Sequence, residues 1–170
     1  MPVIKGPDES IDYGKLTNEL IKQYATPLLR VCCLRLGDRQ LAEDAVSETF
    51  FKVYKALPHF RGDASCKTFI LRIAENVCRD MLRRRKARHA DCEVGLDEAA
   101  EQYTDAEVYD DSLFEAVRAL PDRLKTAILL YYYEDMNEHE IAKVLRITPS
   151  AVSRRLTEAK RRLHEMLKEE

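Results

Sequence analysis

Apolar side chains recur at helical spacing along most of this chain, and this periodicity limits what it can fold into. The clearest series, at intervals of three and four residues, is Phe69, Ile70, Ile73, Ala74, Val77, Cys78, Met81 and Leu82. Such intervals place side chains on one face of an α-helix. Five glycines and six prolines in 170 residues are too few for the turns of an all-β fold. The sequence therefore predicts an all-α protein.

The same reasoning divides the chain into two helical domains. We expect helices over residues 13–36, with a bend near Pro27, over 39–57 and over 66–88. A second set covers residues 113–136, divided at Pro121, and residues 137–167. The predicted organisation is an N-terminal tail (1–12), a first domain (13–90), an acidic flexible linker (91–111) and a second domain (112–170).

Charge is strongly segregated, although the formal net charge is only −2. Six of the ten residues 79–88 are basic, residues 91–112 hold nine acids and no Lys or Arg, and residues 154–162 are basic again. Two basic blocks on either side of an acidic linker indicate two modules that contact a polyanion. The alternative is that each block is a solvated helix face.

Residues 137–167 carry the pattern of a helix-turn-helix. Asn137 followed by Glu140 is a capping box, and Thr148 followed by Pro149 begins another helix. The second helix of such a motif enters the major groove with its first residues. These are Ser150, Ala151, Ser153, Arg154 and Arg155. Lys160 lies further along the helix and is suited to a phosphate contact or to solvent.

Phe51 does not fit the apolar stripe of its own helix. That stripe comprises Leu41, Ala45, Val46, Thr49, Phe50, Val53, Tyr54 and Leu57. Phe51 falls on the opposite side, among Glu48, Lys52 and Lys55, since adjacent residues point about 100° apart on a helix. An apolar ring surrounded by charges is typical of an interface anchor. The other interpretation is that the ring covers the edge of the core.

Three segments in order resemble a sigma factor of bacterial RNA polymerase, of the small extracytoplasmic-function (ECF) kind. AEDAVSETFFKVYKAL (42–57) resembles the polymerase-binding helix of sigma region 2. FRGDASCKTFILRIAENVCRDMLRRRKAR (60–88) resembles the loop and helix that melt and read the −10 element. LPDRLKTAILLYYYEDMNEHEIAKVLRITPSAVSRRLTEAKRRL (120–163) resembles sigma region 4. The resemblance covers nearly all of the chain after residue 12.

The resemblance implies a role for each candidate residue. Asp44, Glu48, Phe51, Lys52 and Lys55 would bind the clamp helices of the largest polymerase subunit. The −10 DNA would be contacted by Phe60, Arg61, Lys67, Phe69, Asn76, Arg79, Arg83, Arg84 and Lys86. The −35 DNA would be contacted by Ser150, Ala151, Ser153, Arg154, Arg155 and Lys160. Asn76 could instead brace its own helix. Further implied partners are the flap region of the polymerase and an anti-sigma factor.

Two rival functions remain at this stage. A one-component regulator, with a sensing or dimerising first domain, would explain the helix-turn-helix but not Phe51 or the basic block at 79–88. An enzyme is disfavoured because the sequence has no glycine-rich phosphate loop, nucleophile elbow or HExxH motif.

We also expect no cofactor and no metal, since the five cysteines lack CxxC spacing. A zinc site built from Cys66, His89, Cys92 and His59 is the weaker alternative. With no apolar run of membrane-spanning length and no signal-peptide pattern, a cytoplasmic location without membrane insertion is expected.

Overall fold

The computed structural model describes residues 12–91 and 111–168, and these form helices and connecting turns without any strand. The helices are α1 (Tyr13–Leu36), α2 (Arg39–Ala56), the short 3₁₀ helix η1 (Leu57–His59), α3 (Cys66–Asp91), α4 (Asp111–Ala119), α5 (Asp122–Tyr132), α6 (Glu138–Leu145) and α7 (Pro149–Met166). The all-α prediction is confirmed. Most of the predicted N-terminal tail and acidic linker lies outside the described residues.

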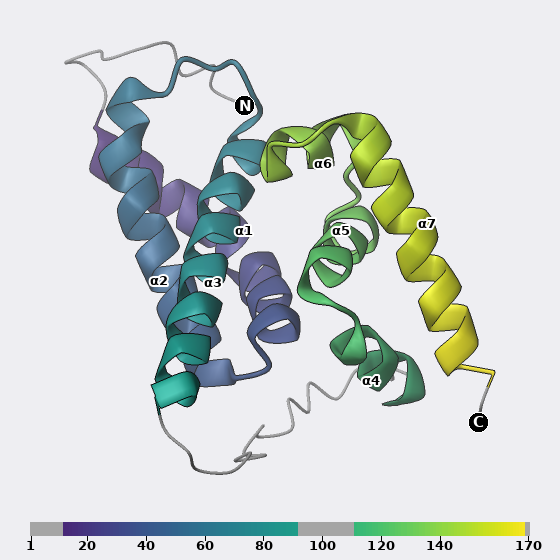
Figure 1. The fold of residues 1–170 in the computed structure, drawn as a ribbon. Helices are drawn as coiled ribbons and strands as arrows, with labels where there is room; N and C mark the ends of the chain where they lie inside the picture. The colour runs from purple at the N-terminus through teal and green to yellow at the C-terminus, as the bar shows by residue number, and fades with distance from the viewer. Residues whose placement is uncertain (1–11, 92–110, 169–170) are drawn as a thin grey trace.

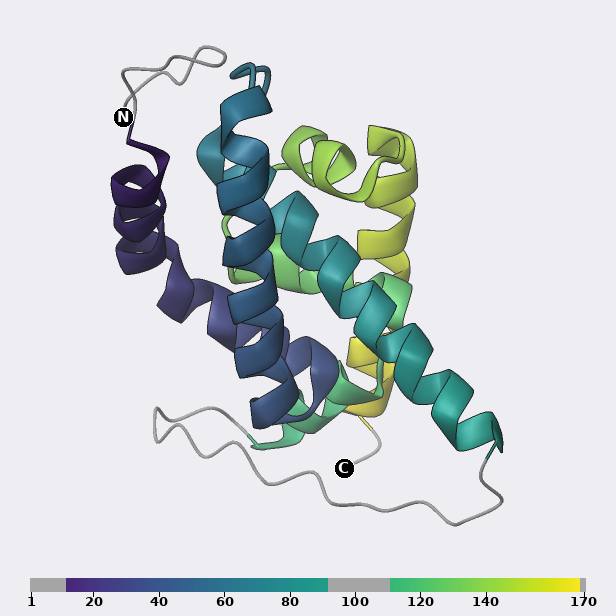
Figure 2. The same cartoon turned by 90° about the vertical axis from the view of Figure 1, so that its left-hand side faces the viewer.

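Local sequence signals set the helix ends in the first half of the chain. The Asp12 carboxylate accepts a hydrogen bond from the backbone N–H of Lys15 at the start of α1. Gly37 ends α1 with a φ of 68°, a left-handed conformation that glycine adopts without strain. Asp38 caps α2 in the same way as Asp12 caps α1. Helix α1 is continuous through Pro27 and bends part-way along its length (Figure 2).

The helices pack as two neighbouring groups that share one apolar core. Helices α1, α2 and α3 form the first group, and α4 to α7 form the second, with α1 and α3 facing α5 and α6 (Figure 1). Buried residues of both groups, among them Leu28, Ile70, Leu124 and Ile141, belong to one continuous cluster. Helices α2 and α7 lie at opposite outer edges, so each keeps one face away from the other group.

None of the helices in the described part of the chain has both the length and the apolar character needed to cross a membrane.

Candidate functional site

The outer face of α2 presents two aromatic rings among charged side chains. Phe51 is 58% exposed and Tyr54 is 48% exposed. Lys55 places its Nζ atom 4.1 Å from the centre of the Phe51 ring, a cation–π contact. Lys52 pairs with Glu48 at 2.7 Å, one turn back on the same helix. Asp44 is also exposed. All five residues predicted to contact polymerase therefore lie on α2, and each has a side chain that is at least partly exposed.

Tyr54 is not where the apolar stripe of α2 placed it. The stripe predicted an inward position, but the ring is half exposed, and it lies one turn from Phe51. Phe50, Val53 and Leu57 of the stripe are buried as expected, and Leu41 and Val46 are partly buried. The tyrosine hydroxyl favours water, so a position at the margin of the stripe can turn outward at little cost. The α2 face thus has two aromatic residues, of which the sequence analysis identified one.

The residues predicted to contact the −10 element lie on and before α3. Phe60 and Phe69 pack ring against ring, with centroids 4.5 Å apart. Arg79 pairs with Glu75 at 3.1 Å, and Arg83 approaches Asp80 at 3.6 Å. Arg61, Arg84 and Lys86 are exposed, and Asn76 is half-buried. The far end of α3 therefore presents a row of accessible cations.

Lys67 differs from these residues because the second helical group already binds it. Its ammonium lies 3.0 Å from the Glu134 carboxylate and also donates to the Glu134 backbone carbonyl. Glu134, just after α5, is only 6% exposed. Nearby, Arg72 donates to the backbone carbonyl of Lys143 in α6 at 3.2 Å. The contacts between Lys67 and Glu134 join the two helical groups, and we call them the Lys67–Glu134 bridge.

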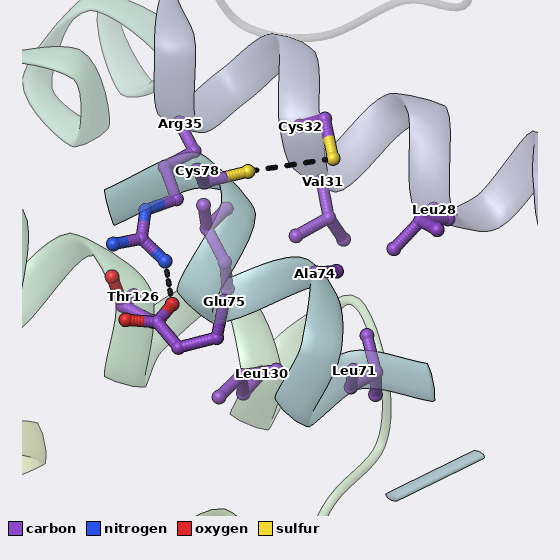
Figure 3. Close-up of a pocket in the computed structure, with 11 residues that line it drawn as sticks. Leu28, Val31, Cys32, Arg35, Leu71, Ala74, Glu75, Cys78, Thr126 and Leu130 are labelled. Carbon is purple, nitrogen blue, oxygen red and sulfur yellow. Dashed lines mark hydrogen bonds and ion pairs between the residues drawn. The ribbon is translucent and has the colours of Figure 1, made fainter. Parts of the chain in front are cut away.

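A second set of charges lies deeper between the two groups. Arg35 of α1 pairs with Glu75 of α3, and both side chains are almost fully buried (Figure 3). Arg35 also reaches Asp122 at the start of α5, at 3.2 Å. A buried arginine that meets two carboxylates is compensated for its lost hydration. The arrangement links α1, α3 and α5 through one guanidinium.

Helices α6 and α7 form the expected helix-turn-helix. Asn137 and Glu140 make the reciprocal capping box at the start of α6, and the Thr148 hydroxyl caps α7. Arg146 adopts a left-handed conformation with a φ of 55° in the turn, at a position where glycine is common. Ile141 and Val152 are fully buried between the two helices.

The first turns of α7 face away from the first helical group, and their polar residues are accessible. Ser150 and Arg154 are exposed, and Ala151, Ser153 and Arg155 are half-buried. Burial lowers the pKa of the Arg155 guanidinium, and the charge of Arg123 lowers it further. The Lys160 side chain lies near two aromatic rings of α5. Its ammonium is 5.3 Å from the centre of the Tyr131 ring and 5.6 Å from that of Tyr132.

The end of α7 carries its own ion-pair network. Glu158 accepts from Arg161 at 2.8 Å and from Arg162 at 2.6 Å, and Arg161 also pairs with Glu165. Hydrogen bonds from these two arginines lower the pKa of Glu158 to about 2. The same contacts with Glu158 and Glu165 raise the pKa of Arg161. Both arginines are therefore partly neutralised within the helix.

Comparisons with known proteins match both halves of the chain. The family model of sigma-70 region 2 matches residues 20–88, and that of sigma-70 region 4 matches residues 110–163. This protein belongs to the ECF sigma factor family. As a sigma factor it binds core RNA polymerase and promoter DNA and directs promoter-specific initiation of transcription. Sigma factors are not enzymes.

Individual relatives agree with this assignment. This sigma factor is 28% identical to RNA polymerase sigma-H factor of Pseudomonas aeruginosa, over 87% of this chain and 84% of the relative. It is 26% identical to ECF sigma factor SigW of Bacillus subtilis, over 89% and 88% of the two chains.

Two solved structures share the fold. The first is sigma factor RpoE of Bartonella quintana in complex with the anti-sigma factor NepR. It has a TM-score of 0.80 and 20% identity, and the match covers 91% of this chain and 98% of that one. The second is CnrH in complex with the cytosolic domain of CnrY. It has a TM-score of 0.71 and 20% identity, over 92% and 90% of the two chains.

An apolar groove in the second half of this sigma factor was not predicted from the sequence. The groove has a volume of about 430 Å³ and lies between α4, α5 and α7, with Leu34 of α1 at one side. Four of its side chains are large, apolar or aromatic, and exposed, namely Leu113, Tyr132, Tyr133 and Leu167. The run Tyr131–Tyr133 held a signal, because three consecutive rings on a helix cannot all face one core. As for Phe51, this signal indicates that at least one ring of the run must be exposed.

The zinc site considered as an alternative involves His89 and Cys92, whose side chains are not described. Among residues 12–91 and 111–168, no group of three or more His, Cys, Asp or Glu side chains is arranged to hold a metal ion. Cys92, one of the residues considered, lies outside the described residues.

Proposed function

We propose that this sigma factor docks on core RNA polymerase through the outer face of α2, with Phe51 as the anchor. The observation that carries the proposal is the exposed Phe51 ring, which lies among Glu48, Lys52 and Lys55. Interfaces concentrate binding free energy in a few aromatic residues surrounded by polar ones. Tyr54 extends the same apolar patch by one helical turn. Family membership supplies the partner.

Run-off transcription with purified core polymerase tests this proposal. We expect transcripts from its promoters to disappear with Phe51→Asp, because a carboxylate cannot occupy an apolar pocket on the partner. Phe51→Leu keeps an apolar side chain and should retain part of the activity. Ile21→Asp, which changes a partly exposed apolar residue of α1, is the matched control. Normal polymerase binding by a folded Phe51→Asp variant would contradict the proposal.

The promoter-reading roles are part of the same proposal. The loop from Phe60 to Lys67 and Asn76 of α3 receive bases of the opened −10 strand, and the cations further along α3 follow its phosphates. The start of α7 reads the −35 element in the major groove. The exposure of Arg83, Arg84 and Arg154 supports these assignments. Lys67 becomes available to DNA only when the Lys67–Glu134 bridge opens.

An anti-sigma factor is the proposed restraint on this protein. One structural relative, RpoE of Bartonella quintana, was solved in complex with the anti-sigma factor NepR, and it matches 91% of this chain. In the structure the two helical groups pack together and Glu134 binds Lys67. The proposed anti-sigma factor stabilises this packed arrangement. Adding the partner should suppress run-off transcripts and lower the affinity for core polymerase. A partner that binds without either effect would contradict the restraint.

The remaining roles follow from the family. We propose that this sigma factor performs no catalysis itself, that the chemistry of transcription belongs to polymerase, and that it acts in the cytoplasm where polymerase is found. A one-component regulator would instead bind DNA tightly as a dimer without polymerase. Size measurements on the protein with and without promoter DNA distinguish the two.

A further inference from the structure

Two cysteine thiols from different helices meet between the helical groups. Cys32 of α1 and Cys78 of α3 lie 46 residues apart in the sequence, and their sulfur atoms lie 3.7 Å apart (Figure 3). Both cysteines are free and buried. At this separation either thiol can donate a hydrogen bond to the other, and a movement of less than about 2 Å would bring the sulfurs to disulfide bonding distance.

The second helical group covers this pair. Cys32 and Cys78 line a small cavity whose far wall is formed by Thr126, Leu129 and Leu130 of α5. The cavity has a volume of about 20 Å³, which is room for roughly one water molecule. A peroxide molecule is larger than water, so it has poor access to the sulfurs while α5 is in place. When the two groups separate, α5 leaves and this wall is removed.

The hydrogen bond between the two thiols shifts their pKa values in opposite directions. The hydrogen bond with Cys32 lowers the pKa of the Cys78 thiol, burial opposes this, and the Arg35 guanidinium lowers it further. The same hydrogen bond and burial raise the pKa of Cys32. Because the thiolate is the reactive form, Cys78 is the thiol expected to react first, and Cys32, its neighbour, is the thiol left to resolve the product.

We propose that Cys32 and Cys78 are an oxidation site of this sigma factor, which peroxide converts to a disulfide when the second helical group leaves α1 and α3. The Cys78 thiolate attacks one oxygen of hydrogen peroxide; the O–O bond breaks, and the leaving hydroxide takes a proton to become water. The Cys32 sulfur then attacks the resulting sulfenic acid and expels its hydroxyl as a second water. Both sulfurs are oxidised and the peroxide is reduced.

The site has a direct connection to domain packing. Cys32 precedes Arg35 by one turn on α1, and Glu75 precedes Cys78 by one turn on α3, so the thiol pair and the buried ion pair occupy neighbouring turns of the same two helices. A disulfide would fix the spacing of α1 and α3 beside the contact that Arg35 makes with α5. Oxidation of the two thiols and docking of the second helical group therefore affect the same contact region between α1, α3 and α5. This inference does not depend on the polymerase-docking proposal.

The first test is peptide mapping of the full-length protein. The chain is treated with hydrogen peroxide, remaining thiols are blocked with a maleimide, and the digest is examined by mass spectrometry. We expect a linked peptide pair containing Cys32 and Cys78 that disappears on reduction with dithiothreitol. The Cys32→Ala and Cys78→Ala variants should lose it, whereas Cys33→Ala and Cys66→Ala should keep it. Reduced Cys32 and Cys78 under conditions in which the two helical groups are separated, after the other thiols have reacted, would overturn the proposal.

The second test measures how docking controls the rate. Glu134→Gln removes the carboxylate that holds Lys67, and small-angle scattering identifies solution conditions in which this variant is more extended than the wild type. Under these conditions we expect the Cys32–Cys78 disulfide to form several-fold faster than in the wild type. Glu43→Gln removes an exposed carboxylate of α2 and should leave the rate unchanged. Equal rates in the extended and compact forms would overturn the role of docking.

Discussion

The contact zone between the two helical groups and helix α7 are both rich in charge, yet their charges are paired differently. In the contact zone Arg35, Glu75 and Glu134 are buried, and each of them pairs with a residue of another helix. On α7 the pairs of Glu158 join residues three and four positions apart on the same exposed helix. Charges of the first kind link different helices, and those of the second kind stay within a single helix. The difference arises from burial rather than from residue type.

The largest expected effect comes from Arg35→Met, in the contact zone. It leaves the Glu75 carboxylate buried without its principal partner, which typically costs about 3–5 kcal/mol. We expect the free energy of unfolding, measured with urea, to fall by that order. Arg161→Met removes an exposed arginine of α7 and should leave stability nearly unchanged. Similar losses in the two variants would remove the distinction between the two regions.

Arg154→Ala is expected to weaken binding without affecting the fold. If this exposed arginine reads a base, its loss costs about 1–3 kcal/mol, or roughly five- to a hundredfold in affinity for −35 DNA. Fluorescence anisotropy with a promoter duplex, at stated salt, measures it. Arg161→Ala is the control, because Glu158 and Glu165 already bind that arginine. A small, sequence-independent loss with Arg154→Ala would indicate a phosphate contact instead.

Glu134→Gln tests the Lys67–Glu134 bridge. We expect it to raise the affinity for DNA, by less than Arg154→Ala lowers it. Lys67 keeps about a third of its side chain exposed, so water already screens the pair. An ion pair of this kind contributes up to about 1 kcal/mol, and we expect single-stranded −10 DNA to bind roughly twofold to fivefold more tightly. The Lys67→Gln variant should not show this gain. Unchanged or weaker DNA binding by Glu134→Gln would mean that the bridge does not compete with DNA.

The smallest expected effect concerns the pKa of the Glu158 carboxyl. Its pKa of about 2 lies below the ordinary value of 4.5, so its ion pairs stabilise the folded state at neutral pH. That contribution is present above about pH 4.5 and is lost as the pH falls toward 2. NMR titration of the Glu158 carboxyl measures it directly. We expect Arg162→Ala to raise this pKa toward the ordinary value, while Arg154→Ala leaves it unchanged.

Much of the fold was accessible from local patterns in the sequence. Helices were predicted over 13–36, 39–57 and about 66–88, and they occupy Tyr13–Leu36, Arg39–Ala56 and Cys66–Asp91. The capping box at Asn137 and the cap at Thr148 were also predicted correctly. These features depend on residues within a few positions of each other, so the sequence contains the whole interaction. The predicted division at Pro121 is confirmed, since this proline occupies the N-cap position of α5 and the helix begins at Asp122.

Contacts between distant segments could not be predicted in this way. Nothing near Lys67 in the sequence indicates Glu134, and nothing near Cys32 indicates Cys78. Tyr54 occupies an apolar position of its stripe but is 48% exposed, and the stripe alone did not indicate this. The roles of the predicted polymerase and DNA contacts remain proposals, although the structure now shows which of these side chains are free to act.

The sequence by itself determined the helices, their caps, the helix-turn-helix and the order of the two sigma regions. These follow from backbone geometry and from the helical repeat of apolar residues, both of which operate over a few residues. Only the tertiary structure decided which charges are buried, which thiols meet and which predicted DNA contact is already occupied. Burial and pairing depend on how α1 and α3 pack against α5 and α6, and that packing is the sum of many weak contacts between distant parts of the chain.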